Sequence, residues 1–386
     1  MRVIVDANIP AAERCFGALG EVIALPGREI DGAALAGAEA LIVRSITRVD
    51  AALLEAAERA GARLRFVGTC TIGTDHVDQA ALAARGIEFA SAPGCNAEAV
   101  VDYVLSSLTL LAERTDAALD QRRIGIVGAG NVGERLYRRL TALGLDCRRC
   151  DPPRAEAEPG ERFYDLDGLC QWAEVLCLHA PLVPDGPHAT HHLLNAERIA
   201  ALKPGTWLLN AGRGDCLDGA ALRQRLADAG DLRTVLDVWE AEPGIDAALW
   251  QLADIATPHI AGYSLDGKLR GTQQVYAAAL RRFGMPAGLS FEDLAPPPPL
   301  TRLELGSGLS PWEALRLCMR AVYDVRRDHD GLARMAAELG MARGFDAWRA
   351  GYPLRREFAT LEVAFGKDSQ SLVPLCAAAG FRVRGY

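Results

Sequence analysis

Short apolar runs alternate with Ala-rich helical stretches along the first hundred residues of the chain. Four of these runs predict buried strands, at Val3–Val5, Ala40–Val43, Leu64–Val67 and Ile87–Ala90. Repeated strand–helix units of this kind predict a parallel sheet with helices on both faces. Ligands of such sheets bind beyond the carboxyl ends of the strands. The small and polar residues that follow each run are therefore candidates for a binding site.

A second strand–helix series follows a long predicted helix, which Asn96 caps and which runs to about Glu113. Its strands are expected at Arg123–Val127, Leu145–Arg149, Val175–Leu178, Thr206–Leu209, Thr234–Leu236 and Asp254–Ala256. The pattern predicts a second parallel sheet covered by helices.

The pattern changes again at Pro296–Pro299, a run of four prolines that is typical of a boundary. Beyond it we expect a strand at Arg302–Leu305 and two helices, around Trp312–Asp328 and Asp330–Leu339. No catalytic motif is evident in this part. The whole chain is thus predicted to be α/β, with two doubly wound parallel-sheet domains and a small α+β domain at the C-terminus.

Composition and charge narrow the class of protein. The chain has 386 residues, of which 50% are hydrophobic, and a net charge of −8. An acidic chain is a poor general nucleic-acid binder, and no stretch is long and apolar enough for a membrane span. The N-terminus lacks the features of a signal peptide. We therefore expect a cytoplasmic protein with neither a nucleic-acid nor a membrane partner.

Cysteines and histidines give no sign of a metal site. The ten cysteines are too sparse for a disulfide scaffold. Cys147 and Cys150 form a C-x-x-C pair, but no second pair is spaced to complete a zinc site. Reduced thiols on or after a strand are the preferred interpretation, and no metal is expected.

A glycine motif indicates a dinucleotide site. It directly follows the strand at Ile124–Val127 and opens a helix expected over Val132–Leu143, which is the context that G-x-G-x-x-G requires. The first glycine permits a tight turn, the second lets the backbone approach a pyrophosphate, and the third lets helix and strand pack closely. The candidate cofactor residues here are Gly128, Gly130, Asn131, Val132 and Gly133.

Asp151 follows the next strand, where an acidic residue is expected to bind a ribose hydroxyl. A carboxylate there favours NAD over NADP, because it repels a 2′-phosphate. Arg148, Arg149 and Arg154 lie close by in the sequence and keep NADP open. Methyltransferases share the glycine fingerprint, so the residues further along the chain must decide between the two classes.

Three polar groups follow later strands of this sheet: Arg213 in Asn210–Gly214, Glu242 in Asp237–Pro243, and His259 in Thr257–Gly262. This trio suits oxidation of a 2-hydroxy acid. A neutral histidine accepts the hydroxyl proton, and a carboxylate orients its imidazole. The arginine binds the substrate carboxylate with its planar fork.

With these motifs, residues 1–285 resemble the D-isomer-specific 2-hydroxyacid dehydrogenases. The resemblance implies that Arg213, Glu242 and His259 are the catalytic residues and that NAD is the cofactor. It also implies three domains: a flavodoxin-like substrate domain (1–95 and 260–285), a Rossmann NAD domain (96–259) and a C-terminal dimerisation domain (286–386). Further implied cofactor contacts are Ala211, Gly212, Asp237 and Gly262, and the implied substrate contacts are Ser45, Thr71 and Tyr263. Asp237 has a second interpretation as a residue that caps a turn.

One branch of this family resembles the chain over nearly its full length, including Val322–Asp328. That branch implies oxidation of a phosphorylated hydroxy acid, 4-phospho-D-erythronate, to 2-oxo-3-hydroxy-4-phosphobutanoate in pyridoxine 5′-phosphate biosynthesis, by a homodimer. Ala180 departs from the hydroxyl residue common in the family. Candidate phosphate ligands are Arg44, Arg48, Lys268 and Arg270. Two alternatives stay open: a sister dehydrogenase for 3-phosphoglycerate or hydroxypyruvate, and a non-catalytic NADH-sensing regulator.

Overall fold

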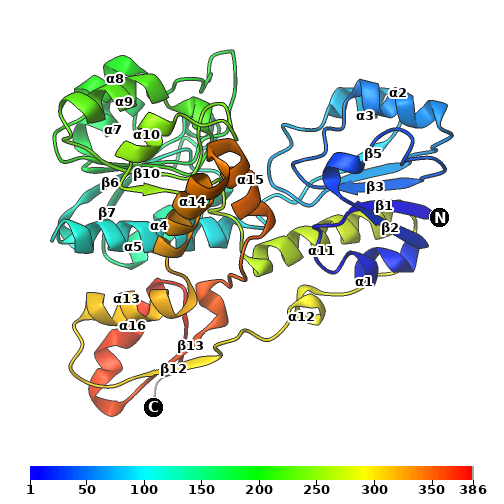
Figure 1. Cartoon of the computed structure of the whole chain (residues 1–386). Helices are drawn as coiled ribbons and strands as arrows, with labels where there is room; N and C mark the ends of the chain where they lie inside the picture. Colours follow the sequence, from blue (N-terminus) through cyan, green and yellow to red (C-terminus); the bar gives the residue numbers. More distant parts are fainter. Residues whose placement is uncertain (385–386) are drawn as a thin grey trace. The chain divides into compact units, whose positions relative to one another are not determined.

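The computed structural model describes residues 1–384 and divides into two compact units (Figure 1). Unit 1 comprises Met1–Ala97 and Tyr263–Pro297, and unit 2 comprises Glu98–Gly262 and Pro298–Tyr386. The sequence divided the chain into three parts, whereas residues beyond 298 fall within the same compact unit as the glycine motif. The roles given to these parts remain predictions.

Unit 1 is built on a five-stranded parallel sheet with the order β2-β1-β3-β4-β5. Its strands are β1 (Arg2–Asp6), β2 (Glu21–Leu25), β3 (Ala40–Val43), β4 (Phe66–Thr69) and β5 (Glu88–Ala90). Its helices are α1 (Ala12–Phe16), α2 (Ala51–Arg59), α3 (Gln79–Ala84), α11 (Leu265–Arg282) and α12 (Phe291–Leu294). This is the flavodoxin-like order, so the predicted fold class of this part is confirmed.

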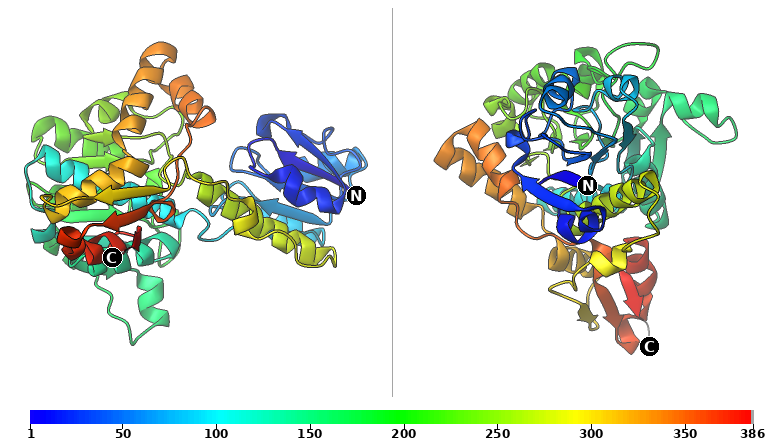
Figure 2. Two further views of the ribbon diagram at one scale, coloured as in Figure 1. Left: turned by 90° about the horizontal axis from the view of Figure 1, so that it is seen from below. Right: turned by 90° about the vertical axis from the view of Figure 1, so that its right-hand side faces the viewer.

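Helix α11 joins this sheet although it is almost two hundred residues away from β4 in the chain (Figure 2). Gly68 makes the close approach possible, because a Cβ atom there would lie 2.3 Å from Cγ1 of Val275. Val275 and Leu269 of α11 are buried in one apolar cluster with Val3 and Val5 of β1.

Unit 2 contains a six-stranded parallel sheet with the order β11-β10-β9-β8-β6-β7. The strands are β6 (Arg123–Val127), β7 (Asp146–Cys150), β8 (Val175–Leu178), β9 (Trp207–Asn210), β10 (Arg233–Leu236) and β11 (Ile255–Ala256). The accompanying helices are α4 (Ala97–Arg114), α5 (Asn131–Ala142), α6 (Pro152–Ala157), α7 (Leu166–Trp172), α8 (Ala196–Ala201), α9 (Gly219–Asp228) and α10 (Ala247–Leu252).

In the Rossmann strand order a further strand pairs with the free edge of the strand equivalent to β7. The described residues form no strand at that edge. A single hydrogen bond marks the place, in which the Tyr164 N–H donates to the Arg149 carbonyl over 2.8 Å. All six parallel strands expected from the sequence are present within a residue or two of their expected limits. The doubly wound parallel architecture is confirmed.

The C-terminal part of unit 2 has a parallel three-stranded sheet of its own. Its elements are β12 (Arg302–Leu305), β13 (Glu362–Phe365), β14 (Arg382–Arg384), α13 (Pro311–Val322), α14 (Arg326–Leu339), α15 (Met341–Ala350) and α16 (Val373–Ala378). Helices α14 and α15 pack together (Figure 1). Leu332 and Phe345 from these helices are buried in one cluster with Trp239 and Ala256, so this segment shares the core of the six-stranded sheet.

The helix expected over Trp312–Asp328 is wrong in its extent. Helix α13 ends at Val322, and Tyr323 is extended at φ −151° and ψ 127°. The Tyr323 hydroxyl donates to Asp328 over 2.8 Å, and the Asp324 carboxylate accepts from the Arg326 N–H, which starts the next helix. Burial of the tyrosine in a polar cluster therefore outweighs continuation of the helix.

Candidate functional site

The glycine motif forms a turn that only glycine fits. Gly128 has φ +85°, and a Cβ atom there would lie 2.6 Å from the Ala180 nitrogen. A Cβ on Gly133 would lie 1.9 Å from the Gly128 carbonyl oxygen. Gly130 has no atom within 4 Å of such a position, so it faces open space at the start of α5. Backbone N–H groups at that helix start are suited to a pyrophosphate.

Asp151 lies at the end of β7, beside this turn. Its Oδ2 accepts from the Ala129 N–H over 2.8 Å, and its Oδ1 accepts from the Arg154 N–H over 3.1 Å. A carboxylate has about four acceptor positions, so acceptor capacity remains for a ribose hydroxyl. The motif and the acidic residue are therefore brought together as predicted.

The three arginines near Asp151 are already engaged. Arg149 is buried and forms ion pairs with Glu134 and with Glu161 at 2.7 Å. Arg154 pairs with Glu134 at 2.9 Å and also donates to the Ala129 carbonyl. The Arg148 guanidinium lies 4.0 Å from the centre of the Trp172 ring. The charges of Arg149 and Arg154 are thus neutralised by glutamates, which favours NAD over a cofactor with a 2′-phosphate.

A half-buried histidine whose two ring nitrogens are buried adds to this cradle. Neither ring nitrogen of His179, directly after β8, has a partner among the described residues. Burial lowers the pKa of His179 to about 4, so the ring is neutral at pH 7. A Cβ on Gly212, after β9, would lie 2.8 Å from the Ala180 carbonyl oxygen. Tight glycine turns, an acidic residue at the second strand and an orphaned buried polar ring all fit a bound dinucleotide.

Arg213 is carried by a turn that its neighbours fix. The Asn210 side-chain amide donates to the Arg213 carbonyl over 3.0 Å, and its oxygen accepts from the Gly212 N–H over 3.1 Å. Gly214 touches the loop after β10, because a Cβ there would lie 2.0 Å from the carbonyl of Trp239. The loop that carries Arg213 therefore packs directly on the loop that carries Glu242.

Glu242 and His259 form the pair predicted from the sequence. Oε2 of Glu242 lies 2.8 Å from Nδ1 of His259. Burial alone would raise the pKa of Glu242, but the His259 charge, their hydrogen bond and the Trp239 N–H hold this pKa below its ordinary value. Both loops contain a non-glycine residue in the left-handed region, Ala241 at φ +57° and His259 at φ +54°. Such conformations persist only where the surroundings fix them.

Asp237 holds the loop that carries His259 through three hydrogen bonds. Its Oδ1 accepts from the Thr257 hydroxyl at 2.7 Å and from the Ile260 N–H at 2.8 Å. Its Oδ2 accepts from the Ala261 N–H at 2.9 Å, and the side chain is buried. The turn-holding interpretation therefore matches the observed bonds, while a contact of Asp237 or of the adjacent Gly262 with the cofactor stays a prediction.

The predicted substrate residues lie in unit 1. The Thr71 hydroxyl lies 2.8 Å from that of Thr69, which in turn lies 3.0 Å from Nε2 of His76. Ser45 follows β3 and is exposed. Tyr263 precedes α11, whose first turn is capped by the side chain of Ser264. The roles of these three residues stay predictions.

The four candidate phosphate ligands have different surroundings. Arg48 forms an exposed ion pair with Asp50 at 3.3 Å, and Arg270 donates to the Cys95 carbonyl over 2.8 Å. In contrast, the Arg44 guanidinium and the Lys268 ammonium lie 5.6 Å and 4.6 Å from the centre of the Tyr263 ring. Two cations thus gather around a single predicted substrate contact.

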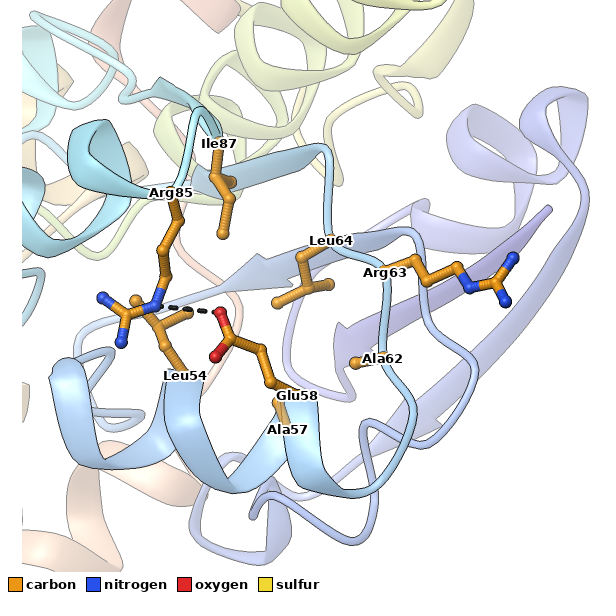
Figure 3. A pocket seen from close by; sticks show the side chains of 8 residues that line it. All are labelled: Leu54, Ala57, Glu58, Ala62, Arg63, Leu64, Arg85 and Ile87. Carbon is orange, nitrogen blue, oxygen red and sulfur yellow. Dashed lines mark hydrogen bonds and ion pairs between the residues drawn. The ribbon is translucent and has the colours of Figure 1, made fainter.

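Two other features carry no site. The pocket drawn in Figure 3 is lined by α2 and by the segments before β4 and β5 of unit 1, and the Arg85–Glu58 ion pair at 3.0 Å spans it. None of its lining residues is a predicted site residue. All ten cysteines are free thiols, nine of them buried, and burial raises the pKa of Cys147 and Cys150 to about 12. Within residues 1–384 no group of three potential ligands could hold a metal ion, and no helix is long and apolar enough to cross a membrane.

Sequence reasoning missed Glu134 and His179. Glu134 follows the last glycine of the motif directly. Several arginines lie near it in the sequence, and they were a signal that Glu134 would form ion pairs. His179 sits directly after a buried strand, the same position that singled out the other site residues, and that signal was sufficient to find it.

Comparison with known proteins agrees with this geometry. Residues 109–261 match the family of D-isomer-specific 2-hydroxyacid dehydrogenase NAD-binding domains, and residues 294–375 match a domain of unknown function (DUF3410). A solved Thermus thermophilus structure is 29% identical with a TM-score of 0.63, and it covers 74% of this chain and 97% of its own. An NAD-bound Staphylococcus aureus formate dehydrogenase has the same fold, with a TM-score of 0.60, 21% identity, and coverage of 74% and 96%.

The fold and the glycine cradle define an NAD-dependent dehydrogenase. Among curated relatives, a protein from Chromohalobacter salexigens is 59% identical over 100% of this chain and 99% of its own length. One from Azotobacter vinelandii is 52% identical over 98% and 99%. Both are named erythronate-4-phosphate dehydrogenase. The chain belongs to the erythronate-4-phosphate dehydrogenases, within the D-isomer-specific 2-hydroxyacid dehydrogenase family.

Proposed function

We propose that the chain oxidises 4-phospho-D-erythronate to 2-oxo-3-hydroxy-4-phosphobutanoate with NAD, in the biosynthesis of pyridoxine 5′-phosphate. The observation that carries the chemistry is the 2.8 Å contact between Glu242 and Nδ1 of His259. The relatives named for this substrate, with 46% to 59% identity across the chain, support the substrate.

Bound NAD supplies the hydride acceptor, and the residues of the chain supply the rest. When Nδ1–H of His259 donates to Glu242, the lone pair of Nε2 is left to accept a proton. The substrate hydroxyl gives that proton to Nε2 as C2 loses its hydride, and the Glu242 carboxylate stabilises the imidazolium that results. The depressed pKa of Glu242 keeps this carboxylate ionised.

Arg213 binds the substrate carboxylate with its guanidinium fork in this proposal. Ser45, Thr71 and Tyr263 bind the hydroxyl-bearing part of the substrate. Support for Arg213 comes from the fixed turn that presents it, since Asn210 binds both sides of this turn.

Arg44 and Lys268 are our candidates for the 4-phosphate, because both lie around the Tyr263 ring. Arg48 is less suited, since the Asp50 carboxylate engages it in an exposed ion pair, and no contact of Arg270 with Tyr263 occurs among those described for the structure. Two cations near one tyrosine would bind a dianion with charge-assisted hydrogen bonds, which are about twice as strong as neutral ones.

The cofactor contacts follow from the cradle. The backbone of Gly128–Gly133 would bind the pyrophosphate and Asp151 a ribose hydroxyl. The loop at Ala211 and Gly212 and the loop from Asp237 to Gly262 would border the nicotinamide. The support is the glycine geometry at Gly128, Gly133 and Gly212, where no other side chain has room.

The first experiment compares NADH formation with 4-phospho-D-erythronate, D-3-phosphoglycerate and D-glycerate, with a 2-oxo acid added in a parallel set. We expect the four-carbon phosphate to give the largest kcat/KM. Preference for phosphoglycerate would move the chain to a sister dehydrogenase. Binding of NADH without turnover of any of the three would favour a regulator that senses NADH.

We also propose a homodimer that forms through residues 286–386. Five of the eight exposed large apolar residues among the described residues lie there, namely Leu300, Leu309, Leu317, Leu339 and Leu354. A contiguous apolar patch is what marks an interface, and we infer that some of these side chains form one across the two-fold axis of the dimer. Light scattering on the full chain should give twice 41.3 kDa, and Leu317→Glu should lower that mass. A monomeric wild-type chain would contradict the proposal.

The cytoplasm is the compartment we propose. The ten free thiols suit a reducing environment, and a small-molecule substrate with NAD is available there. Fractionation of cells that express the chain checks this proposal.

A further inference from the structure

Arg355 is a buried charge that the reaction described above does not use. It follows α15, in the part of the chain that matches a domain of unknown function, and only 2% of its surface is exposed. We propose that Arg355 is a positioning residue that fixes the His259 loop, and so gives the C-terminal segment a part in the reaction. This inference rests on the proposed function of His259.

The guanidinium of Arg355 binds the loop directly after the histidine. Its Nη1 donates to the carbonyl oxygens of Ile260 at 3.4 Å and Ala261 at 3.0 Å. Its Nη2 donates to the Ala99 carbonyl at 2.5 Å, on the first turn of α4. One side chain of the C-terminal segment therefore ties the loop to the long helix of the same unit.

Asp237 binds the same two residues of the loop through their N–H groups. It accepts from the N–H groups of Ile260 and Ala261, while Arg355 donates to their carbonyls. The peptide group between Ile260 and Ala261 is thus held at both polar ends, its N–H by Asp237 and its carbonyl by Arg355. His259 itself is left-handed at φ +54°, a conformation that a non-glycine residue keeps only where its surroundings impose it. We infer that this pair of charges imposes it.

Arg355 is in turn held by the C-terminal segment. Its guanidinium carbon lies 3.6 Å from the centre of the Tyr323 ring, a close cation–π contact. The hydroxyls of Tyr323 and Tyr352 both donate to Oδ2 of Asp328, at 2.8 Å and 2.7 Å. Asp328 is fully buried. The tyrosine that interrupts the expected helix is therefore the one that supports the arginine.

The contacts exclude a direct role in the chemistry. All of the donor groups of Arg355 with known partners point to backbone carbonyls, and the side chain has almost no exposed surface for a substrate. Removal of the guanidinium would take away the hydrogen bonds that the carbonyls of Ile260 and Ala261 accept from it, which is unfavourable for buried acceptors. The loop would then relax, and the backbone of His259 would leave the left-handed region.

The test compares Arg355→Met and Arg355→Lys with the control Arg327→Met in the full-length protein. Arg327 belongs to the same cluster, where it donates to Asp328 at 3.1 Å and to the Tyr352 hydroxyl at 2.9 Å. No contact of Arg327 with residues 257–262 occurs among those described for the structure. The control thus perturbs the cluster and spares the loop.

Hydrogen exchange measured by mass spectrometry is the first readout, because it needs no turnover. We expect Arg355→Met to speed exchange at the amides of Ile260 and Ala261, and Arg327→Met to leave them protected. Turnover is the second readout: kcat should fall about tenfold to a hundredfold in Arg355→Met, with the KM for NAD little changed. Arg355→Lys should recover part of kcat, because an ammonium still donates to a carbonyl.

Each outcome has a definite meaning. Unchanged exchange at these amides in Arg355→Met, or equal exchange in the control, would overturn the proposal. Faster exchange with unaltered kcat would overturn the link to the reaction. If the wild-type chain turned over no 2-hydroxy acid, the proposed function would fail, and the exchange data alone would still decide whether Arg355 fixes the loop.

Discussion

The two large sheets share a parallel architecture and a common strand order, yet their carboxyl edges carry different chemistry. In unit 1 the strands are followed by hydroxyls and cations, such as Thr71 and Arg44. In unit 2 they are followed by glycine turns, carboxylates and an imidazole, such as Gly128, Asp151 and His259. The fold therefore provides equivalent positions, and the residues placed there decide between binding an anion and moving a proton.

The two edges also differ in how firmly their residues are held. Asp237 receives three hydrogen bonds, and Glu242 and His259 bind each other. In unit 1, Ser45 is exposed and Arg44 makes one longer contact, to the Asn8 carbonyl at 3.3 Å. Substitutions in unit 2 should thus change the chemical step or cofactor affinity, and those in unit 1 should change substrate affinity.

The largest effect is expected at His259. His259→Asn removes the proton acceptor, so kcat should fall roughly 10²–10⁴-fold, while NADH still binds. Glu242→Gln should lower kcat less, because it leaves the imidazole in place without its ionised partner. Steady-state rates and NADH fluorescence titration measure both. Equal loss of NADH affinity would assign the pair to binding rather than chemistry.

Arg44→Met should produce the next largest effect, and on substrate affinity alone. A hydrogen bond to a charged group contributes about 1.5–3 kcal/mol, so the KM for 4-phospho-D-erythronate should rise roughly tenfold to a hundredfold. The KM for a phosphate-free analogue and the affinity for NADH should not change. Arg48→Met is the matched control, since Arg48 is the exposed partner of Asp50. Equal rises for both substrates would remove Arg44 from the phosphate site.

Asp151→Ala should have a smaller effect, confined to the cofactor. We expect a higher KM for NAD and no useful activity with NADP, because Glu134 still neutralises Arg149 and Arg154. Initial rates with both cofactors check this. Strong activity of the single variant with NADP would show that the arginines are available to a 2′-phosphate after all.

The smallest effect concerns stability and pH. The pKa of His179 is lowered to about 4 by burial, from 6.5 in the unfolded chain. Between these values the unfolded state binds the extra proton, so stability is complete above about pH 6.5 and falls as the pH drops towards 4. His179→Gln should lose part of that acid sensitivity, which appears as a flatter plot of Tm against pH. An unchanged slope would mean that His179 is protonated when folded.

Much of this comparison could be predicted from the sequence, because buried parallel strands are short apolar runs and the site residues follow them directly. Short sequence motifs were sufficient to find Gly128–Gly133, Asp151, Glu242 and His259. The structure brings the first two together and pairs the last two. Strand β2 was missed because it lies at the sheet edge and is partly exposed, so it lacks a continuous buried run.

Long-range contacts were beyond the reach of the sequence. Strands β13 and β14 are only 4 and 3 residues long, and their pairing depends on segments far away in the chain. Arg355 binds backbone carbonyls almost a hundred residues before it, and such partners leave no signature in residue types. The end of α13 before Tyr323 could not be predicted for the same reason, because it depends on contacts of Tyr323 with Asp328 and Arg355 in the folded chain.

The buried thiols give the protein an internal reporter of its own motions. Nine of the ten cysteines are buried and free, and they are distributed over both units: Cys15, Cys70 and Cys95 in unit 1, and Cys150, Cys170, Cys177, Cys216, Cys318 and Cys376 in unit 2. A thiol reagent reaches such a sulfur only when the surrounding structure opens. The labelling rate of each cysteine, read by mass spectrometry, would therefore record local opening site by site, with no probe to introduce.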